Sequence, residues 1–272
     1  MQEKIITIYC LCADFLSAWG LEDDPQARVS TAEVMTVALV AAALFHGHQD
    51  RARLLLKGHA YIPRMLSASR FNRRLHAIDE SVWEGFFVLW AEAHKPINDG
   101  QEYVVDSMPI PVCDNYRIGR CKIYQDPEHR GYIARKRRYF FGLRVHLVIT
   151  ATGKPVAFVL RPGAEADIRA FKRLRLDLPA GAGLYSDTAY TDYTEEALLS
   201  EEGDIRRVCP RKKNSLWRHP GWLEYICKYT RKRVETTFSR IEAELARHIH
   251  AVTPRGFELK VFLTLLAYSI SA

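Results

Sequence analysis

The sequence changes its hydrophobic periodicity near residue 100, and this change most constrains what the chain can fold into. Before it, apolar residues recur every three to four positions and glycine is scarce, as in amphipathic helices. After it, short β-branched runs alternate with helical patterns. The stretch KPINDGQ (95–101) separates the two parts. We therefore predict an all-α region over residues 1–95 and an α/β domain over residues 101–272.

The helical region contains a short arginine-rich helix between two longer ones. The segment 30–45 opens with Ser30 and Glu33 in a capping-box arrangement, and the segment 79–95 ends before a proline. Between them, IPRMLSASRFNRRLHAI places arginines around two apolar residues. Such a helix can lie along a DNA backbone, although any three-helix bundle can produce the same pattern. We expect this region to bind DNA or to mediate dimerisation, with DNA contacts from Arg70, Arg73 and Arg74.

The second part of the chain reads as three strands, a helix, a strand, a helix, a strand and two final helices. The first three strands are EYVVDS, RYFFGLRVHLVIT and PVAFVLRP, the last two joined by the turn ATGK. The fourth strand is AGLYSD, and the penultimate helix is YTRKRVETTFSRIEAELARHI. A hairpin followed by strand–helix alternation predicts a mixed sheet with helices on its faces, so the fold class is α/β.

Positive charge is concentrated in two blocks. The chain carries a net charge of +7, but residues 120–145 carry +6 and residues 205–233 carry +9, which leaves −8 elsewhere. Two basic blocks on an acidic body indicate a surface that binds a polyanion, although a pair of solvated loops would look the same. In the basic insertion at about 211–227, Trp217 and Trp222 are interpreted either as stacking on an unpaired base or as anchoring the loop. The predicted DNA contacts in the two blocks are Arg135, Lys136, Arg137, Arg138, Arg211, Lys212, Lys213, Arg231, Lys232 and Arg233.

Three carboxylates occupy positions that the predicted fold can bring together. Asp106 lies in the first strand, Asp187 ends the fourth strand, and Glu235 lies on the penultimate helix. In a mixed sheet of this order the first and fourth strands can be neighbours, and a helix crossing their ends would bring Glu235 over the two aspartates. Glu235 follows Val234, so it lies at the margin of the helix's apolar stripe. That predicted stripe consists of Val234, Phe238, Ile241, Leu245 and Ile249.

Each acid also has an ordinary structural interpretation. Asp106 could cap a turn, and Glu235 could form a surface pair with Arg231. Asp192 is a rival to Asp187, but Asp187 is favoured because it follows the apolar run directly, whereas Asp192 is typical of a helix N-cap. Glu242 is the rival glutamate.

Three converging carboxylates would repel one another unless divalent cations held them. Mg²⁺ prefers oxygen ligands and keeps positions for water and phosphate oxygens. Two such ions about 4 Å apart can activate an attacking oxygen and stabilise a leaving one. Beside two basic blocks, this pattern favours metal-dependent phosphodiester chemistry on DNA, with two Mg²⁺ ions per site and Mn²⁺ able to substitute.

Four stretches carry a resemblance to a known family. VVDSMPIPVCDN, RYFFGLRVHLVIT, YSDTAYTDY and RKRVETTFSRIEAELARHIHAVTPRGFELKVFLTLLAY resemble DDE-type insertion-sequence transposases. The resemblance extends from about residue 67 to the end and implies an RNase H-like catalytic core with Asp106, Asp187 and Glu235 as metal-binding triad. Arg231 is similar to the arginine of a Tyr–Arg–Glu–Lys signature that contacts DNA near the cleavage site. The chain departs from that signature at two positions. It has Lys228 where the signature has Tyr, and Glu242 where the signature has Lys.

The resemblance implies a DNA transposase that cleaves at transposon ends and transfers the new 3′-hydroxyl into target DNA. Its expected partners are double-stranded DNA at the element ends and the target, and a second copy in a homodimer. A structure-selective RNase H-like nuclease and a non-catalytic DNA-binding repressor are the alternatives. The longest uncharged apolar run, residues 34–45, is too short to span a bilayer. With no signal peptide evident, we predict a cytoplasmic protein without a membrane partner.

Overall fold

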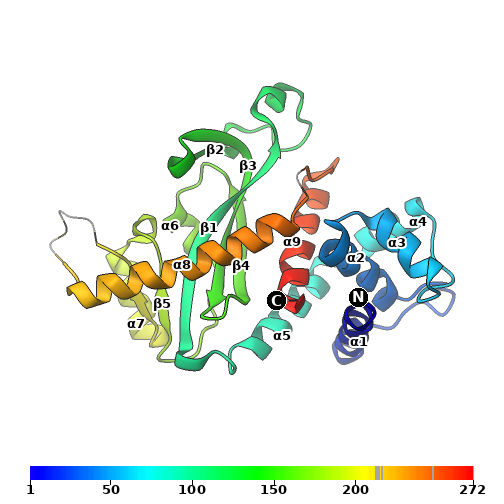
Figure 1. Ribbon diagram of the computed structural model, residues 1–272, viewed down its shortest axis with the longest axis horizontal. Coiled ribbons are helices and arrows are strands. Elements are labelled where there is room, and N and C mark those ends of the chain that lie inside the picture. The colour runs from blue at the N-terminus through cyan, green and yellow to red at the C-terminus, as the bar shows by residue number, and fades with distance from the viewer. Residues whose placement is uncertain (212–214, 216, 247, 272) are drawn as a thin grey trace. The chain divides into compact units, whose positions relative to one another are not determined.

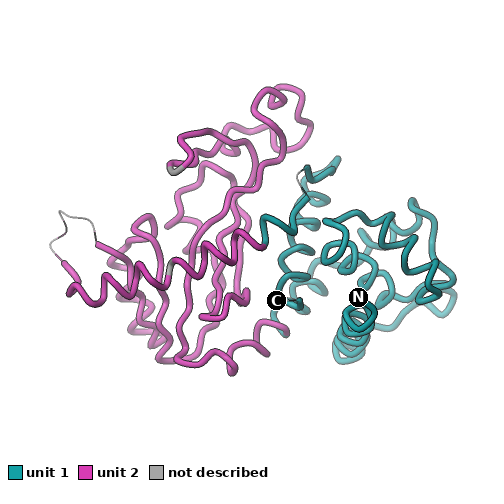
Figure 2. Tube along the Cα trace, viewed as in Figure 1, with its two compact units in different colours: residues 1–89, 241–272 teal, residues 90–240 magenta. Residues whose placement is uncertain are grey.

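The chain folds into two compact units (Figure 2). The computed structural model describes residues 1–211, 215, 217–246 and 248–271, and it leaves out the side chains of Arg135 and Arg231. Unit 1 comprises residues 1–89 together with 241–272, and unit 2 comprises residues 90–240.

Unit 1 is helical, as the periodicity predicts. Its central helix, α2 (Thr31–Phe45), begins with the expected capping box. Ser30 Oγ accepts from Glu33 N at 3.1 Å, and Glu33 Oε2 accepts from Ser30 N at 2.7 Å. Nearly every side of this helix is buried, so the other helices of the unit enclose it. The helices are α1 (Gln2–Trp19), α2 (Thr31–Phe45), α3 (Gln49–Gly58), α4 (Ala68–Ala77), part of α5 (Glu80–His94) and α9 (Pro254–Ser271) (Figure 1).

Helix α9 belongs to unit 1 by compactness, whereas the sequence pattern assigned it to the α/β domain. Val261, Leu265 and Leu266 of α9 are buried, and α9 packs against α2. A helix that is apolar on most of its sides needs cover from several neighbours. Sequence order alone does not indicate that the cover comes from helices more than 200 residues earlier in the chain.

Unit 2 is built on one mixed sheet of six strands, which confirms the predicted fold class. The strand order is β2-β3-β1-β5-β6, and β4 also pairs with β3. Strand β1 is antiparallel to β3 and parallel to β5, so the first and fourth predicted strands are neighbours. Of the strands in the described part of the chain, β2 alone was not predicted. The strands are β1 (Glu102–Cys113), β2 (Arg130–Ile133), β3 (Arg138–Thr150), β4 (Pro155–Pro162), β5 (Gly183–Tyr185) and β6 (Arg206–Val208).

Among the described residues, the α-helices that accompany the sheet, besides the end of α5, are α6 (Asp167–Phe171), α7 (Tyr193–Gly203) and α8 (Gly221–Glu244). Helix α8 crosses one face of the sheet (Figure 1). It begins at Gly221 rather than 229 and ends at Glu244 rather than 249. Residues 221–227 of the predicted basic insertion are therefore helical. They belong to the first turns of α8, whose apolar side chains pack on the sheet.

No single helix within the described ranges is long and apolar enough to cross a membrane. The bent pair α2 and α3 meets that test together, on length and composition alone.

Candidate active site

The sheet register aligns Asp106 with Asp187. Strands β1 and β5 pair in parallel up to Val104 opposite Tyr185. Asp106 lies two residues beyond Val104, and Asp187 lies two residues beyond Tyr185. Asp106 lies within β1 and, because side chains alternate along a strand, projects from the same face as Val104. Asp187 lies past the end of β5 in extended backbone (φ −79°, ψ 165°), so we expect its side chain on the same face as Tyr185.

Helix α8 covers that face. Tyr185 packs with Val208 of β6 and Cys227 of α8, and the α8 residues Leu223 and Ile226 pack against the same cluster. Helix α8 also reaches the start of β1, where Arg233 Nη1 lies 3.8 Å from Glu102 Oε2. Helix α8, which carries Glu235, therefore covers the sheet face that Val104 and Tyr185 share.

Each aspartate is oriented by the residue that follows it. Asp106 Oδ1 accepts the Ser107 N–H at 2.8 Å. Asp187 Oδ1 accepts the Thr188 N–H at 2.6 Å and the Thr188 hydroxyl at 3.2 Å. Asp187 thereby caps a short 3₁₀ turn, Thr188–Tyr190, that redirects the chain after β5. Both aspartates are half-buried, so their carboxylates lie at the rim of the core.

Glu235 lies on the exposed side of α8. It directly follows Val234, which is fully buried, and its carbonyl accepts the Ser239 hydroxyl at 2.9 Å. Among the described residues, no three His, Cys, Asp or Glu side chains are close enough together to hold a metal ion. The acidic triad of Asp106, Asp187 and Glu235 stays a prediction.

The buried stripe of α8 is more polar than the sequence suggested. Of the predicted stripe, Val234 and Ile241 are fully buried, whereas Phe238 is only half-buried. Leu245 and Ile249 lie beyond the end of the helix. The remaining positions of the stripe are small residues that fit under a helix lying close to a sheet, namely Cys227, Thr230 and Thr237.

The rival acids have other surroundings. Asp192 is the N-cap of α7, and its Oδ1 accepts from Thr194 N at 3.1 Å and Glu195 N at 3.3 Å. Its Oδ2 lies 2.8 Å from Lys172 Nζ, and the hydrogen bond from Lys172 lowers the pKa of Asp192. These contacts match the capping role expected for Asp192. Glu242 is exposed near the end of α8.

The donor set at the aspartate pair suits a hard divalent cation. Neighbouring strands lie about 4.8 Å apart, so carboxylates at aligned positions on one face can approach the same ion. Mg²⁺ binds one or two carboxylates and keeps its other positions for water and phosphate. Asp106 and Asp187 fit that requirement, and Glu235 would join them from α8.

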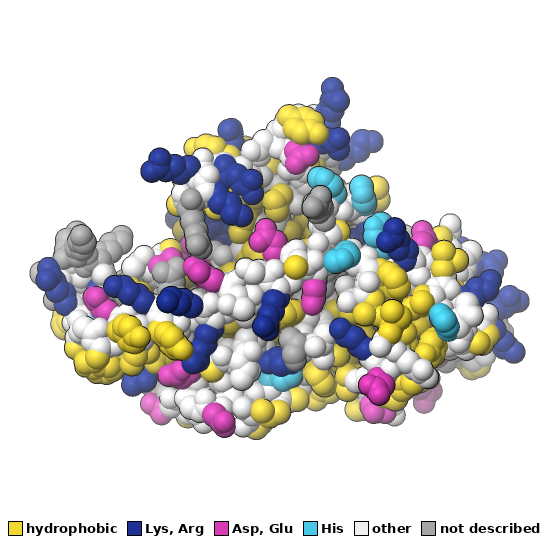
Figure 3. Space-filling model, viewed as in Figure 1, with side chains coloured by type: hydrophobic (Ala, Val, Ile, Leu, Met, Phe, Trp, Pro, Cys, Tyr) yellow, Lys and Arg dark blue, Asp and Glu magenta, His cyan; other side chains and the backbone are white. Residues whose placement is uncertain are grey.

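The basic residues of unit 2 gather at the β2–β3 end of the sheet and along α8 (Figure 3). Lys136 and Arg137 are exposed in the turn between β2 and β3, and Arg138 is exposed at the start of β3. Lys232 is exposed on α8, and the Arg233 guanidinium lies 5.8 Å from the Tyr229 ring centroid. Of the remaining predicted contacts here, Lys212 and Lys213 lie outside the described residues, as do the side chains of Arg135 and Arg231.

Arg211 has a structural role instead of the predicted exposed one. Its Nη1 and Nη2 donate to Glu196 Oε1 and Oε2 at 2.8 and 2.5 Å, and its side chain is only 7% exposed. Its guanidinium also lies 4.8 Å from the Tyr193 ring centroid. This fork ties the segment after β6 to α7, so we remove Arg211 from the DNA-contacting set.

Exposed aromatic side chains accompany the cations at the start of α8. Trp217 is 72% exposed and Trp222 is 63% exposed, so neither anchors the preceding loop to the body of unit 2. Tyr225 and Tyr229 stack with ring centroids 6.4 Å apart. The spacing of positions 222, 225 and 229 on one side of a helix could have revealed this stripe, but the predicted helix began too late.

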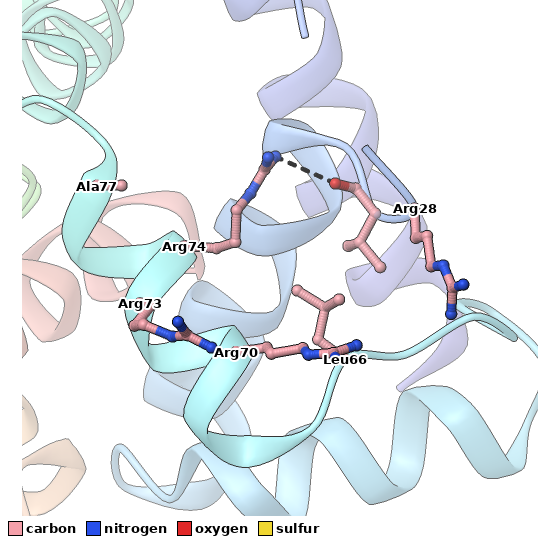
Figure 4. A pocket seen from close by; sticks show the side chains of 7 residues that line it. Arg28, Leu66, Arg70, Arg73, Arg74 and Ala77 are labelled. Atoms are coloured by element: carbon pink, nitrogen blue, oxygen red, sulfur yellow. Dashed lines mark hydrogen bonds between the residues drawn. The ribbon is translucent and has the colours of Figure 1, made fainter. Parts of the chain in front are cut away.

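Unit 1 carries an arginine-lined pocket of about 400 Å³ between α4 and the segment before α2 (Figure 4). Arg70 and Arg73 line it as exposed side chains of α4. Arg74 also lines it, but its Nη2 donates to Val29 O at 3.1 Å and lies 3.3 Å from Asp23 Oδ1. Arg74 therefore holds α4 in place. Arg28 completes the pocket, and no periodic pattern marked it in the sequence.

A family model for the transposase DDE domain matches residues 98–270. The chain belongs to the transposase DDE domain family, because that range covers more than half of it and runs from before β1 into α9. No curated protein matches the chain.

Proposed function

We propose that this protein cleaves DNA at the ends of a mobile element and joins those ends to target DNA, in a reaction that depends on Mg²⁺ or Mn²⁺. The alignment of Asp106 with Asp187 on the sheet face under α8 carries this proposal. Family membership supports it, because the matched range contains both aspartates and Glu235.

Each of the three acidic residues has its own role in the proposed reaction. Asp106 and Asp187 would hold two divalent cations, and Glu235 would complete one of the sites. When bound, such ions supply charge stabilisation and activation of an attacking oxygen. In the first reaction a water oxygen attacks the phosphorus at the element end, and the 3′-oxygen leaves as a hydroxyl. In the second, that 3′-hydroxyl attacks a target phosphodiester, so a new ester forms and the target's own 3′-oxygen leaves.

Two surfaces would hold the DNA during these reactions. In unit 2, the turn at 136–138 and the cations of α8 would contact the backbone, and the exposed Trp222 would stack on an unpaired base. In unit 1, Arg28, Arg70 and Arg73 would hold a phosphate in the pocket of α4. Two ends and a target require more than one active site, so the working form would be at least a dimer. We expect it to act in the cytoplasm.

The test is a cleavage and joining assay on a labelled duplex carrying the DNA that flanks the gene, with Mg²⁺ or Mn²⁺. The expected result is cleavage at a defined end followed by joined products, with both absent in Asp106→Asn while DNA binding remains. Cleavage without joined products at any concentration would favour the structure-selective nuclease. Tight binding without cleavage in either metal would favour the repressor.

The unit 1 pocket is tested by the salt dependence of DNA binding. Each phosphate contact contributes about 0.9 to the slope of log K against log salt. Arg70→Ala and Arg73→Ala should each lower that slope by about this amount, and the change should not depend on DNA sequence. Arg64→Ala, an exposed arginine outside the pocket, is the matched control. Equal slopes in all four proteins would remove the pocket from the DNA surface.

A further inference from the structure

A buried polar cluster lies on the sheet face opposite the two aspartates. His146 of β3 pairs with Ser107 of β1, so their side chains share a face. Ser107 directly follows Asp106, so this face is the one that Asp106 and α8 do not occupy. Asp167 at the start of α6 and Tyr190 at the end of the 3₁₀ turn complete the contacts there. We call Ser107, Arg144, His146, Asp167 and Tyr190 the back-face cluster.

Each member of the back-face cluster contacts at least one other. Asp167 Oδ1 accepts from Arg144 Nη1 at 3.0 Å and from Ser107 Oγ at 3.2 Å. His146 Nδ1 lies 2.9 Å from the Tyr190 hydroxyl oxygen. Burial raises the pKa of Tyr190, and the nearby Ser107 side chain lowers it. His146 and Tyr190 are both completely buried. The single negative charge of Asp167 is therefore balanced by the guanidinium of Arg144.

Burial decides the protonation states of the two rings. It lowers the pKa of His146 to about 4, against the opposing effect of the Asp167 charge, so the imidazole is neutral at neutral pH. Burial also raises the pKa of Tyr190 well above its usual value. His146 Nε2 is buried without a hydrogen-bond partner among the described residues. A proton there would be a buried unpaired donor, which costs about 1–3 kcal/mol, so the proton belongs on Nδ1.

This tautomer assigns the donors in the cluster. His146 Nδ1–H donates to the Tyr190 oxygen, and Ser107 Oγ and Arg144 Nη1 donate to Asp167 Oδ1. These hydrogen bonds form only when β1, β3, α6 and the 3₁₀ turn keep their spacing, since each of them joins two of those elements.

The back-face cluster is attached directly to both aspartates. Ser107 is the residue after Asp106 on β1. Tyr190 closes the turn that Asp187 caps, with its N–H donating to Asp187 O at 3.1 Å. The other side of that turn is held by Arg207, whose Nη2 donates to Tyr190 O. The backbone after Asp187 is thus held from behind by the buried side chains of Tyr190 and Arg207, and the backbone after Asp106 by the half-buried Ser107.

We propose that the back-face cluster sets the spacing of the Asp106 and Asp187 carboxylates, with Tyr190 and Ser107 as positioning residues for metal binding. The inference rests on the proposed function, because it assigns the residues that support the proposed metal site. Groups that orient metal ligands without touching the metal typically change metal affinity or activity by about 10- to 100-fold when removed.

The experiment compares Tyr190→Phe and Ser107→Ala with the wild-type protein by direct titration with Mn²⁺ in the presence of duplex DNA. Each substitution removes one oxygen, and we expect about a 10-fold or greater loss of Mn²⁺ affinity from each. The double variant should lose little more than either single variant, because both residues belong to the back-face cluster and would act on the same pair of carboxylates. Cleavage by Tyr190→Phe should recover at high Mn²⁺, whereas a folding defect would not respond in this way.

Tyr103→Phe is the matched control. Tyr103 is completely buried on β1, and its hydroxyl has no hydrogen-bond partner among the described residues. Its removal should leave Mn²⁺ affinity unchanged. An unchanged affinity in folded Tyr190→Phe would overturn the inference while leaving the proposed function intact. If Asp106→Asn bound Mn²⁺ as tightly as the wild type, the proposed metal site itself would fail, and the inference with it.

Discussion

Polar side chains lie in different environments on the two faces of the unit 2 sheet. The consecutive residues Asp106 and Ser107 point to opposite faces and show the contrast. On the α8 face, Asp106 and Asp187 are half-buried, and each accepts a hydrogen bond from the next backbone N–H. On the other face, His146 and Tyr190 are completely buried and contact each other. One face is suited to exchanging ligands and the other to keeping a fixed geometry.

The difference follows from the cost of burying charge. A carboxylate removed from water needs a partner or it becomes protonated, which is why Asp167 is paired with Arg144 on the back face. At the α8 face the aspartates stay near solvent, where a cation can arrive and leave. The proposed reaction site and the back-face cluster that we propose supports it can therefore lie on opposite faces of the same strand.

The largest expected effect is at the two aspartates. Asp106→Asn and Asp187→Asn should each reduce metal-dependent cleavage by about a thousandfold or more. Charge stabilisation by a bound metal contributes several kcal/mol, and every 1.36 kcal/mol is tenfold in rate. Single-turnover rates on the flanking-DNA duplex measure the loss. Asp192→Asn is the control, because asparagine also caps helices well. A comparable loss of cleavage in Asp192→Asn would contradict the choice of Asp187 over Asp192 as the metal-binding aspartate.

A smaller effect is expected from the glutamate on α8. Glu235→Gln should slow cleavage by about a hundredfold while leaving the free energy of unfolding nearly unchanged, because the side chain is exposed. Glu242→Gln, also exposed on α8, should behave like the wild type. The same single-turnover assay, with denaturant unfolding beside it, separates the two. If Glu242→Gln were the slow variant instead, the acid that completes the α8 face would be Glu242.

The smallest of the three effects is a pH dependence of stability from the back face. Because the His146 pKa is about 4 in the folded protein and 6.5 ordinarily, its contribution is complete above pH 6.5 and is lost as the pH falls toward 4. Between pH 7 and pH 5 the loss is roughly 2 kcal/mol, at about 1.4 kcal/mol per pH unit where only the unfolded chain binds the proton.

Urea unfolding of the wild type and His146→Gln at pH 7 and pH 5 measures that contribution. The variant should be less stable at pH 7 but should show a smaller fall between the two pH values. The titratable and charged groups that surround the imidazole are Asp167, Arg144, Glu165, Arg161 and Tyr190. An equal fall in both proteins would mean that His146 is not the neutral buried group on which the back-face comparison depends.

Much of the fold was readable from local patterns. The capping box at Ser30 and Glu33 fixes the start of α2 through backbone N–H groups within one turn. The turn between β3 and β4 joins two runs whose alternation specifies their pairing. Asp106, Asp187 and Glu235 could be nominated because the order of strands and helices restricts which strand ends can be neighbours. The cap and the hairpin depend on residues close in sequence, whereas the three acids were nominated from the order of the elements.

The tertiary structure decided what depends on distant partners. Arg211 lost its predicted surface role because Glu196 of α7 lies within reach of its guanidinium. The Arg74 guanidinium likewise donates to the Val29 carbonyl and the Asp23 carboxylate. Nothing in the sequence linked His146 to Tyr190 or placed both behind Asp106 and Asp187. Local propensity acts within a few residues, whereas burial and pairing of polar groups depend on which elements the whole chain brings together.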